Sequence, residues 1–367
     1  MNLLKFLKPA LLLPFALLLS GCQLVLLNPA GWVAAQERDL LVVSTILMLI
    51  IIIPVLIMGV YMPWRYRASR PNTDDYDPEF EHSSVFEAFI WGVPVLIIIA
   101  LGALTWIYTH KLDPYKPLAH IDAKPIEVEA VSMDWKWLFI YPELNIASVN
   151  ELVIPTGRPV NMKLTSTSVM NTFSVPALAG MIYSMAGMET KLHFVADESG
   201  KYYGRSANYS GPGFAHMDFV TYAVNEDNFD SWVDKVKSQG SDLSIDNYRV
   251  LEKPSVANSV SYYNGVADGL FDKIVGLCVD PGKVCLGDMM MQDMMGGGGL
   301  DGIKDKEKYV YDEFTPGEGF DSHEFQETLH GNPDEPTKGP LDVRNPDQTA
   351  MLIKNGTTLN NDKARQE

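Results

Sequence analysis

Cysteine is scarce in this chain, with three residues in a length of 367. Cys22 follows an apolar run near the N-terminus, whereas Cys278 and Cys285 flank an Asp-Pro-Gly-Lys turn. Because no histidine stands near that pair, its two thiols do not make up a zinc site of the cysteine–histidine type. They could close a small disulfide if the region lies outside the cytoplasm, or they could stay free thiols.

Positive charge is also in short supply. The chain has 29 Lys and Arg against 46 Asp and Glu, a formal net charge of −17. This balance argues against nucleic acid, and against an anionic membrane surface, as a partner of the soluble part. A catalytic triad or a phosphate-binding loop is not apparent either.

Apolar residues are abundant by contrast, and they are concentrated before Tyr108. The first of them follow two lysines and end in Ser-Gly-Cys, a pattern that predicts a signal peptide over residues 1–21. Leu-Leu-Ser-Gly-Cys also matches a bacterial lipobox, which predicts cleavage before Cys22 and a lipid anchor on it. The alternative is an ordinary signal peptide with an incidental cysteine.

Two further runs, residues 40–61 and 88–108, contain no charged residue. At about 1.5 Å per residue, each is long enough to cross roughly 30 Å of hydrocarbon. We therefore predict two transmembrane helices, with buried core helices as the alternative that their length and purity disfavour. Trp91 and Trp106 stand where aromatic residues anchor a span at the membrane interface.

Charge and signal peptide together predict the topology. Arg65, Arg67 and Arg70 lie in the loop between the two runs, residues 62–87, and positive charge favours the cytoplasmic side. The signal peptide places the N-terminal segment, residues 22–39, in the periplasm. We expect a protein of the bacterial inner membrane whose chain is periplasmic from the linker at residues 109–125 onward.

Beyond the linker, residues 126–224 show the pattern of an all-β domain. IEVEAV, VNMKLTST and KLHFVA alternate apolar and polar residues, and turns rich in Gly, Pro and Asp separate them. This spacing predicts a sandwich or Greek-key barrel. From residue 225 to 287 the period changes, which predicts a helical arm whose apolar face begins with Phe229, Trp232, Val233 and Val236.

The tail, residues 288–367, is rich first in Met and Gly and then in acidic residues, a composition that predicts disorder. It opens with a cluster of methionines. Their thioethers could bind Cu(I), although such clusters are more often flexible apolar patches. The cluster is Met289, Met290, Met291, Met294 and Met295.

Three longer motifs follow the spans in a fixed order. They are VSMDWKWLFIYPE at residues 131–143, STSVMNTFSVPALAGMIYSMAGM at 166–188, and YYGRSANYSGPGFAHMDF at 202–219. With the lipobox and the two spans, they resemble subunit II of the haem–copper oxidase superfamily, in particular that of cytochrome bo-type ubiquinol oxidases. The resemblance covers about residues 22–277 and implies a two-helix transmembrane hairpin followed by a cupredoxin-like Greek-key domain.

In copper-bearing members of this family, the third motif has the form C-x-E-x-C-x₃-H-x₂-M, and the second supplies a further histidine. Serine is a poor replacement for a bridging thiolate, and phenylalanine donates no ligand. The resemblance therefore implies that the copper site is degenerate, that this chain holds no metal, and that His216 is a loop or interface residue. The six corresponding positions hold Asn171, Ser206, Asn208, Ser210, Phe214 and Met217.

The resemblance also implies a function. The chain would be a non-catalytic subunit of a proton-pumping ubiquinol oxidase in the aerobic respiratory chain, with no cofactor of its own. Subunit I would hold the haems and one copper and would receive electrons from ubiquinol, and small subunits III and IV would be further partners. Trp135, Trp137 and Tyr141, part of an electron relay in copper-bearing relatives, would then be core and interface aromatics.

Glu87 stands at the start of the second span, on the predicted cytoplasmic side. An ionisable residue at a membrane boundary is a candidate for proton uptake, and a snorkelling interfacial carboxylate is the alternative. In the family, an acid at this place is associated with the mouth of a proton channel in the large subunit.

Two other interpretations of the whole chain are open at this point. One is a cytochrome c oxidase subunit II that still carries copper, which the residues at the ligand positions disfavour. The other is a stand-alone membrane lipoprotein with a β-sandwich binding module, which need not repeat the long motifs.

Overall fold

The computed structural model describes residues 25–67 and 81–294. It contains two compact units. One is Ala35–Asp113, and the other combines the residues before it with those from Pro114 onward. The predicted signal peptide, Cys22 and the predicted tail from residue 295 lie outside the described residues.

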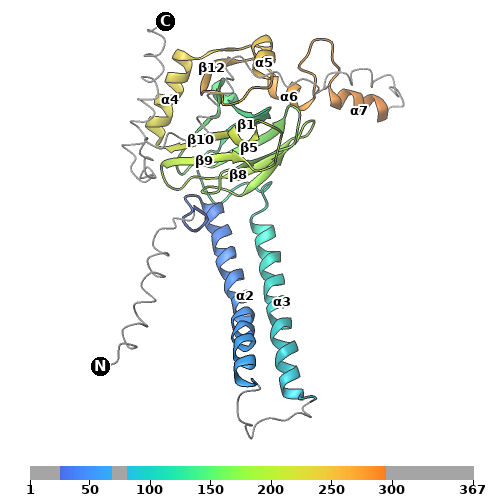
Figure 1. Cartoon of the computed structure of the whole chain (residues 1–367). Coiled ribbons are helices and arrows are strands. Elements are labelled where there is room, and N and C mark those ends of the chain that lie inside the picture. The colour runs from blue at the N-terminus through green and yellow to red at the C-terminus, as the bar shows by residue number, and fades with distance from the viewer. Residues whose placement is uncertain (1–24, 68–80, 295–367) are drawn as a thin grey trace, which may run out of the picture. The chain divides into compact units, whose positions relative to one another are not determined.

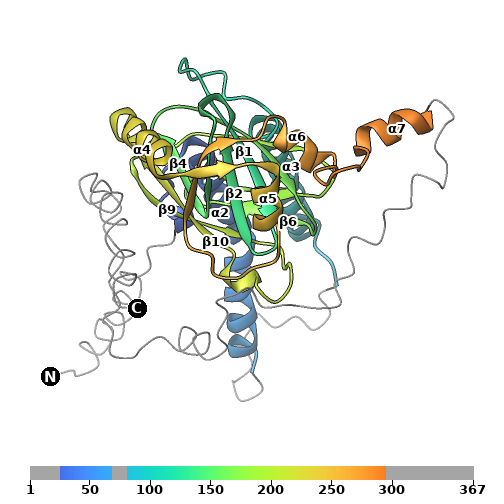
Figure 2. The ribbon, with the colours of Figure 1, turned by 90° about the horizontal axis from the view of Figure 1, so that it is seen from above.

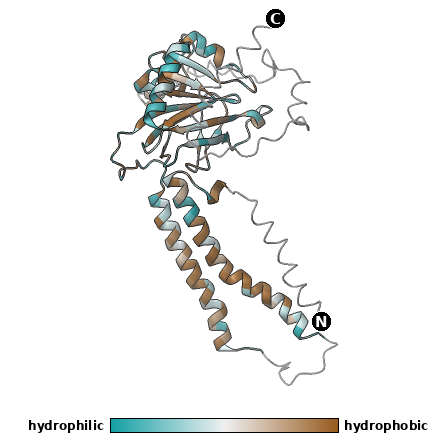
Figure 3. Cartoon of the chain, turned by 90° about the vertical axis from the view of Figure 1, so that its left-hand side faces the viewer, coloured by the Kyte–Doolittle hydropathy of each residue, from teal (hydrophilic) through white to brown (hydrophobic). Residues whose placement is uncertain are grey.

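The first unit consists of two long helices, most of α2 (Trp32–Arg65) and α3 (Ser84–Lys111). Both are long and apolar enough to cross a membrane, and apolar residues cover most of their length in Figure 3. Each extends past the run that predicted it, residues 40–61 or 88–108. A helix satisfies its own backbone hydrogen bonds, so it can continue into the polar headgroup region with polar side chains on its surface.

The second unit is built on two β-sheets, which confirms the predicted all-β domain (Figures 1 and 2). The larger sheet has the order β11-β12-β3-β2-β1-β5-β8, and the smaller β4-β10-β9-β6-β7. Neighbouring strands are antiparallel except in the pairs β1–β5, β4–β10 and β11–β12.

The strands between residues 126 and 224 have the following bounds. Those of the larger sheet are β1 (Ile126–Met133), β2 (Lys136–Tyr141), β3 (Ile146–Val149), β5 (Val160–Ser166) and β8 (Thr190–Phe194). Those of the smaller sheet are β4 (Glu151–Pro155), β6 (Asn171–Ser174), β7 (Met181–Ser184), β9 (Gly200–Ser206) and β10 (Asp218–Val224). Short 3₁₀ turns lie at η1 (Val25–Leu27), η2 (Pro142–Leu144) and η3 (Phe214–His216).

Strand β2 is buried along its entire length. The rings of Trp137 and Phe139 face the smaller sheet, with centroids 5.2–6.4 Å from those of Phe173 and Phe219. The alternate side chains of β2, Leu138 and Ile140, face the opposite way and join a second core with residues of the C-terminal arm. A strand covered on both faces is apolar at successive positions, which explains why KWLFIY does not alternate.

The C-terminal arm covers this second face, and only part of it is helical. Its helices are α4 (Glu226–Gln239), α5 (Ile245–Leu251) and α6 (Leu270–Val275). Helix α4 packs against β12 and lies next to β4, as Figure 2 shows. It begins with the side chain of Asn225 accepting a hydrogen bond from the Asn228 amide. It buries the four apolar residues that its spacing predicted, Phe229, Trp232, Val233 and Val236.

The predicted helical arm over residues 225–287 has its helices, but it also contains two strands that were not predicted. Strands β11 (Ser241–Leu243) and β12 (Ser261–Val266) extend the larger sheet, and β12 pairs antiparallel with β3. Without β12, strand β3 would leave its backbone N–H and C=O groups unpaired at the sheet edge. Pairing with a distant strand therefore decides the conformation of this segment.

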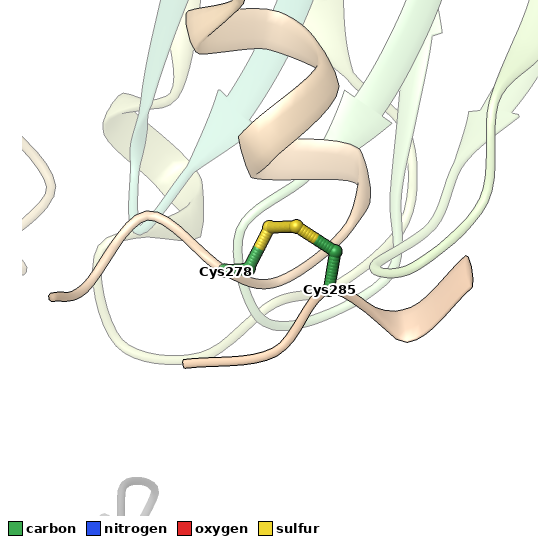
Figure 4. The surroundings of a disulfide bond; sticks show 2 residues. All are labelled: Cys278 and Cys285. Atoms are coloured by element: carbon green, nitrogen blue, oxygen red, sulfur yellow. A yellow bond between two sulfur atoms is a disulfide. The ribbon is translucent and has the colours of Figure 1, made fainter. Parts of the chain in front are cut away.

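The start of the predicted tail is ordered as a helix. Helix α7 (Leu286–Met294) lies within the stretch predicted to be disordered, so that prediction is wrong for residues 288–294. The helix follows directly on a disulfide between Cys278 and Cys285, whose Cα atoms are 4.8 Å apart (Figure 4). The carbonyl of Cys285 accepts hydrogen bonds from the amides of Asp288 and Met289, which holds the first turn in place.

The segment that begins α2 packs closely on the β domain. The Ala30 amide donates to the Ala177 carbonyl at 2.8 Å, and the Ala30 carbonyl accepts from the Asp197 amide at 2.8 Å. At Gly31, a Cβ atom would lie 2.4 Å from the carbonyl oxygen of Val195 and 2.7 Å from that of Leu178. Only glycine therefore fits between these two backbone segments.

We predict that Gly31→Ala destabilises the β domain by about 1–3 kcal/mol, because the added methyl group forces backbone atoms apart. Denaturant unfolding of the detergent-solubilised chain, followed by tryptophan fluorescence, measures the change. The matched control is Gly287→Ala, where a Cβ atom meets nothing within 4 Å. Equal midpoints for Gly31→Ala and the unaltered chain would show that the close packing is absent.

Candidate functional site

The six positions that correspond to copper ligands lie at one end of the smaller sheet. Asn171 is the first residue of β6, Ser206 is the last of β9, and the other four lie in the loop that leads to β10. Because β6 and β10 both pair antiparallel with β9, the start of each lies beside the end of β9. The fold therefore brings together residues that are far apart in sequence.

Hydrogen bonds connect the polar members of this group. The Ser206 hydroxyl donates to the side-chain oxygen of Asn171 at 3.0 Å, and both residues are buried. The Asn171 amide donates in turn to the Val169 carbonyl at 3.2 Å, and the Asn208 amide donates to the Met170 carbonyl at 3.0 Å. These side chains thus satisfy their hydrogen-bonding groups with one another and with the backbone.

The other three positions, Ser210, Phe214 and Met217, make packing contacts. The Ser210 hydroxyl lies 3.9 Å from the sulfur of the buried Met217. The Phe214 ring packs edge-on against Tyr209, with centroids 5.6 Å apart. His216 belongs to the same 3₁₀ turn as Phe214, and its amide donates to the Gly213 carbonyl.

Trp135 packs against the loop between β9 and β10. Its indole N–H donates to the Ser210 carbonyl at 3.1 Å, and its backbone is left-handed, with φ at 65°. A Cβ atom at Gly213 would lie 2.3 Å from the indole ring, and Gly211 has a φ of 109° and also faces the ring. The Gly-Pro-Gly segment is therefore required for the loop to lie flat on Trp135.

These donors do not fit a dinuclear copper centre. Such a centre needs soft thiolates and imidazoles, whereas five of the six positions offer amides, hydroxyls or a phenyl ring. Met217 alone keeps its ligand type, and its thioether is a weak ligand. Over residues 25–67 and 81–294, no group of three or more His, Cys, Asp or Glu residues is placed to hold a metal ion.

The chain matches two known families and several proteins. Residues 96–224 match the family described as cytochrome C oxidase subunit II, periplasmic domain, and residues 237–282 match the COX aromatic-rich motif. Over 266 residues the chain is 49% identical to cytochrome bo(3) ubiquinol oxidase subunit 2 of Pseudomonas putida. That alignment covers 72% of this chain and 84% of its relative. The chain belongs to the ubiquinol oxidase subunit 2 family.

The chain is also similar to a second relative and to a solved structure. The cytochrome bo(3) ubiquinol oxidase subunit 2 of Pseudomonas aeruginosa is 50% identical over 260 residues, 71% of this chain and 78% of that protein. The periplasmic domain of subunit II of cytochrome oxidase from Bradyrhizobium japonicum is 25% identical. It aligns with 31% of this chain and 94% of its own length, at a TM-score of 0.30.

The aromatic residues of the first motif are buried in this member of the ubiquinol oxidase subunit 2 family, as predicted. Trp135, Trp137 and Tyr141 are 7%, 0% and 1% exposed. The Tyr141 hydroxyl donates to the Val153 carbonyl at 2.9 Å, and its ring packs against Trp232 of α4 with centroids 5.2 Å apart. They serve as packing residues of the two cores.

No role was predicted for Lys136 from the sequence, although its place between two tryptophans could have indicated a buried amine. Its ammonium group donates to the Lys253 carbonyl at 2.7 Å and to the Ser255 hydroxyl at 2.6 Å. Burial lowers its pKa to about 8, and the charges of Asp134 and Glu252 oppose that shift. The lysine thereby links the loop before β12 to the motif at residues 131–143.

Glu151, at the start of β4, was missed as well. Its side-chain oxygen accepts hydrogen bonds from the Trp232 indole at 3.0 Å and from the Tyr262 hydroxyl at 2.8 Å. Burial raises the pKa of this carboxyl group above its usual range. No sequence pattern marks it, because its two partners lie far along the chain, in α4 and β12.

Glu87 lies in the first turn of α3, in the first unit, whereas the ligand positions belong to the second. Its carboxylate is 3.0 Å from the Nδ1 atom of His82, and its side chain is 53% exposed.

We predict that Ser206→Ala destabilises the domain by about 1 kcal/mol, because the buried Asn171 oxygen loses its donor. A double-mutant cycle with Asn171→Ala should give a coupling free energy of about 1 kcal/mol. The measurement is denaturant unfolding at one pH. Ser238→Ala, on the exposed side of α4, is the control and should change stability little. A coupling free energy of zero would contradict the hydrogen bond.

Proposed function

We propose that this chain is the non-catalytic subunit II of a proton-pumping ubiquinol oxidase and that its cupredoxin-like domain carries no copper. One observation supports this most directly. The positions of the six expected ligands hold five residues unsuited to copper, and the polar ones are hydrogen-bonded to each other and to the backbone. The relatives named ubiquinol oxidase subunit 2 agree with it.

In this proposal, electrons bypass the periplasmic domain. A domain without a redox centre offers no acceptor to a water-soluble donor such as cytochrome c. Ubiquinol, which is dissolved in the bilayer, would instead reduce haem in subunit I, where oxygen is reduced at a haem–copper pair and protons are pumped. Subunits III and IV would be further partners in the bacterial inner membrane.

The chain would then act as a structural and assembly subunit. Helices α2 and α3 would brace subunit I within the bilayer, and the β domain would cap its periplasmic face. Lipid on Cys22 would add a second anchor to the two spans. The arm, fixed by buried contacts of Lys136 and Glu151, supports a rigid cap.

Metal binding tests this proposal. We expect the purified chain, loaded with copper and dialysed, to retain no purple dinuclear centre. Restoring the ligand types should create one, so the variant carries Asn171→His, Ser206→Cys, Asn208→Glu, Ser210→Cys and Phe214→His. Visible absorption spectra, which report the coloured dinuclear centre, read both results.

The same variant with Met217→Leu serves as the control, because it lacks one ligand of the restored set. A purple, copper-containing centre in the unaltered chain would overturn the proposal. It would instead support the alternative of a copper-bearing cytochrome c oxidase subunit II.

We further propose that Glu87 assists proton uptake at the cytoplasmic side of the complex. Its position in the first turn of α3 and its exposed carboxylate near His82 support this role. Glu87→Gln keeps the size of the side chain and removes its charge. We expect it to slow proton uptake roughly tenfold, a change of about 1.4 kcal/mol in the barrier.

The measurement is oxygen consumption and proton translocation by the complex reconstituted in vesicles. Glu81→Gln is the matched control, since Glu81 is exposed just before the helix and should be replaceable without effect. Unchanged rates in Glu87→Gln would leave the interfacial carboxylate without a part in proton uptake.

A further inference from the structure

Several methionine residues lie on one side of α7. Five of the 17 methionines of the chain fall within the seven residues 289–295. On the helix, Met290 and Met294 are four residues apart and Met291 and Met294 three, so the three lie within an arc of about 100°. Their exposed fractions are 59%, 55% and 89%, and their thioethers are therefore accessible to solvent.

The folded arm holds this helix at its N-terminal end. The Leu286 amide donates to the Gly276 carbonyl at 2.8 Å, and the Leu286 side chain lies against Gly187 in the turn between β7 and β8. Within the loop that the disulfide closes, Asp280 accepts a hydrogen bond from the Arg249 guanidinium at 3.1 Å. The three thioethers are thus presented from a fixed point on the arm.

The three exposed methionines of α7 differ chemically from an ordinary apolar patch. Leucine or isoleucine would be equally apolar, whereas the thioether adds a soft, uncharged donor. Soft donors of this kind select Cu(I) over harder divalent ions. The nearest cysteines, Cys278 and Cys285, are bonded to each other, so they do not compete as thiolates.

We propose that α7 binds one soft monovalent metal cation, Cu(I), through the sulfur atoms of Met290, Met291 and Met294. The site is separate from the degenerate ligand positions, which lie on β6, β9 and the loop before β10. Because a thioether carries no proton to lose, binding is independent of pH over the range in which histidine and carboxylates titrate.

The test uses the full chain in detergent with its disulfide intact. Ag(I) is the probe, because it binds the same soft donors, needs no reductant and leaves the disulfide oxidised. Isothermal titration in chloride-free buffer gives the stoichiometry and affinity. The test variant is Met290→Leu with Met291→Leu and Met294→Leu, since leucine keeps the volume and the apolar character. We expect the affinity for one Ag(I) to fall at least about tenfold, equivalent to about 1.4 kcal/mol.

The matched control replaces three other exposed methionines, Met170, Met181 and Met188, with leucine. It should bind Ag(I) as the unaltered chain does, and both variants should keep the circular dichroism of the fold. Binding by the unaltered chain should be equal at about pH 5.5 and pH 7.5, a range in which an imidazole site would weaken. Equal affinity of the unaltered chain and the α7 variant, or equal loss in the control, would overturn the proposal.

Discussion

Burial of β2 on both faces is the constraint on which the rest of the β domain and its arm depends. Its alternate side chains face the smaller sheet on one side and the C-terminal arm on the other, so the strand needs two covers. The arm is held by more than apolar contact, because Lys136 and Glu151 find their hydrogen-bonding partners on it. If the arm were displaced, water would replace these hydrogen bonds, and the apolar side chains of the second core would be exposed.

The loop between β9 and β10 keeps a defined shape with ligand positions unsuited to copper. In a copper-bearing domain, a metal bound at these positions would cross-link β6, β9 and β10. Here the Ser206–Asn171 hydrogen bond joins β9 to β6, and the Ser210–Met217 contact closes the loop on itself. Trp135 packs against the two loop glycines, so aromatic packing and hydrogen bonds hold the loop in this structure.

Much of this architecture could be predicted from local patterns. The apolar runs indicated α2 and α3, alternation indicated the β domain, and a 3.6-residue period indicated the buried face of α4. Strand β12 could not be predicted, because the free edge of β3 decides its conformation and Ser-Tyr-Tyr-Asn-Gly-Val has no clear period. Helix α7 could not be predicted from composition either. Its first turn is held by backbone hydrogen bonds to the carbonyls of Cys285 and Gly276.

Formation of the bridge between Cys278 and Cys285 depends on the side of the membrane on which the arm folds. Disulfides form in the periplasm and are rare in the reducing cytoplasm. A chain inserted with the opposite orientation would keep both thiols reduced, and the loop between them would lack its covalent closure. The bridge is therefore expected only in chains whose arm reaches an oxidising compartment.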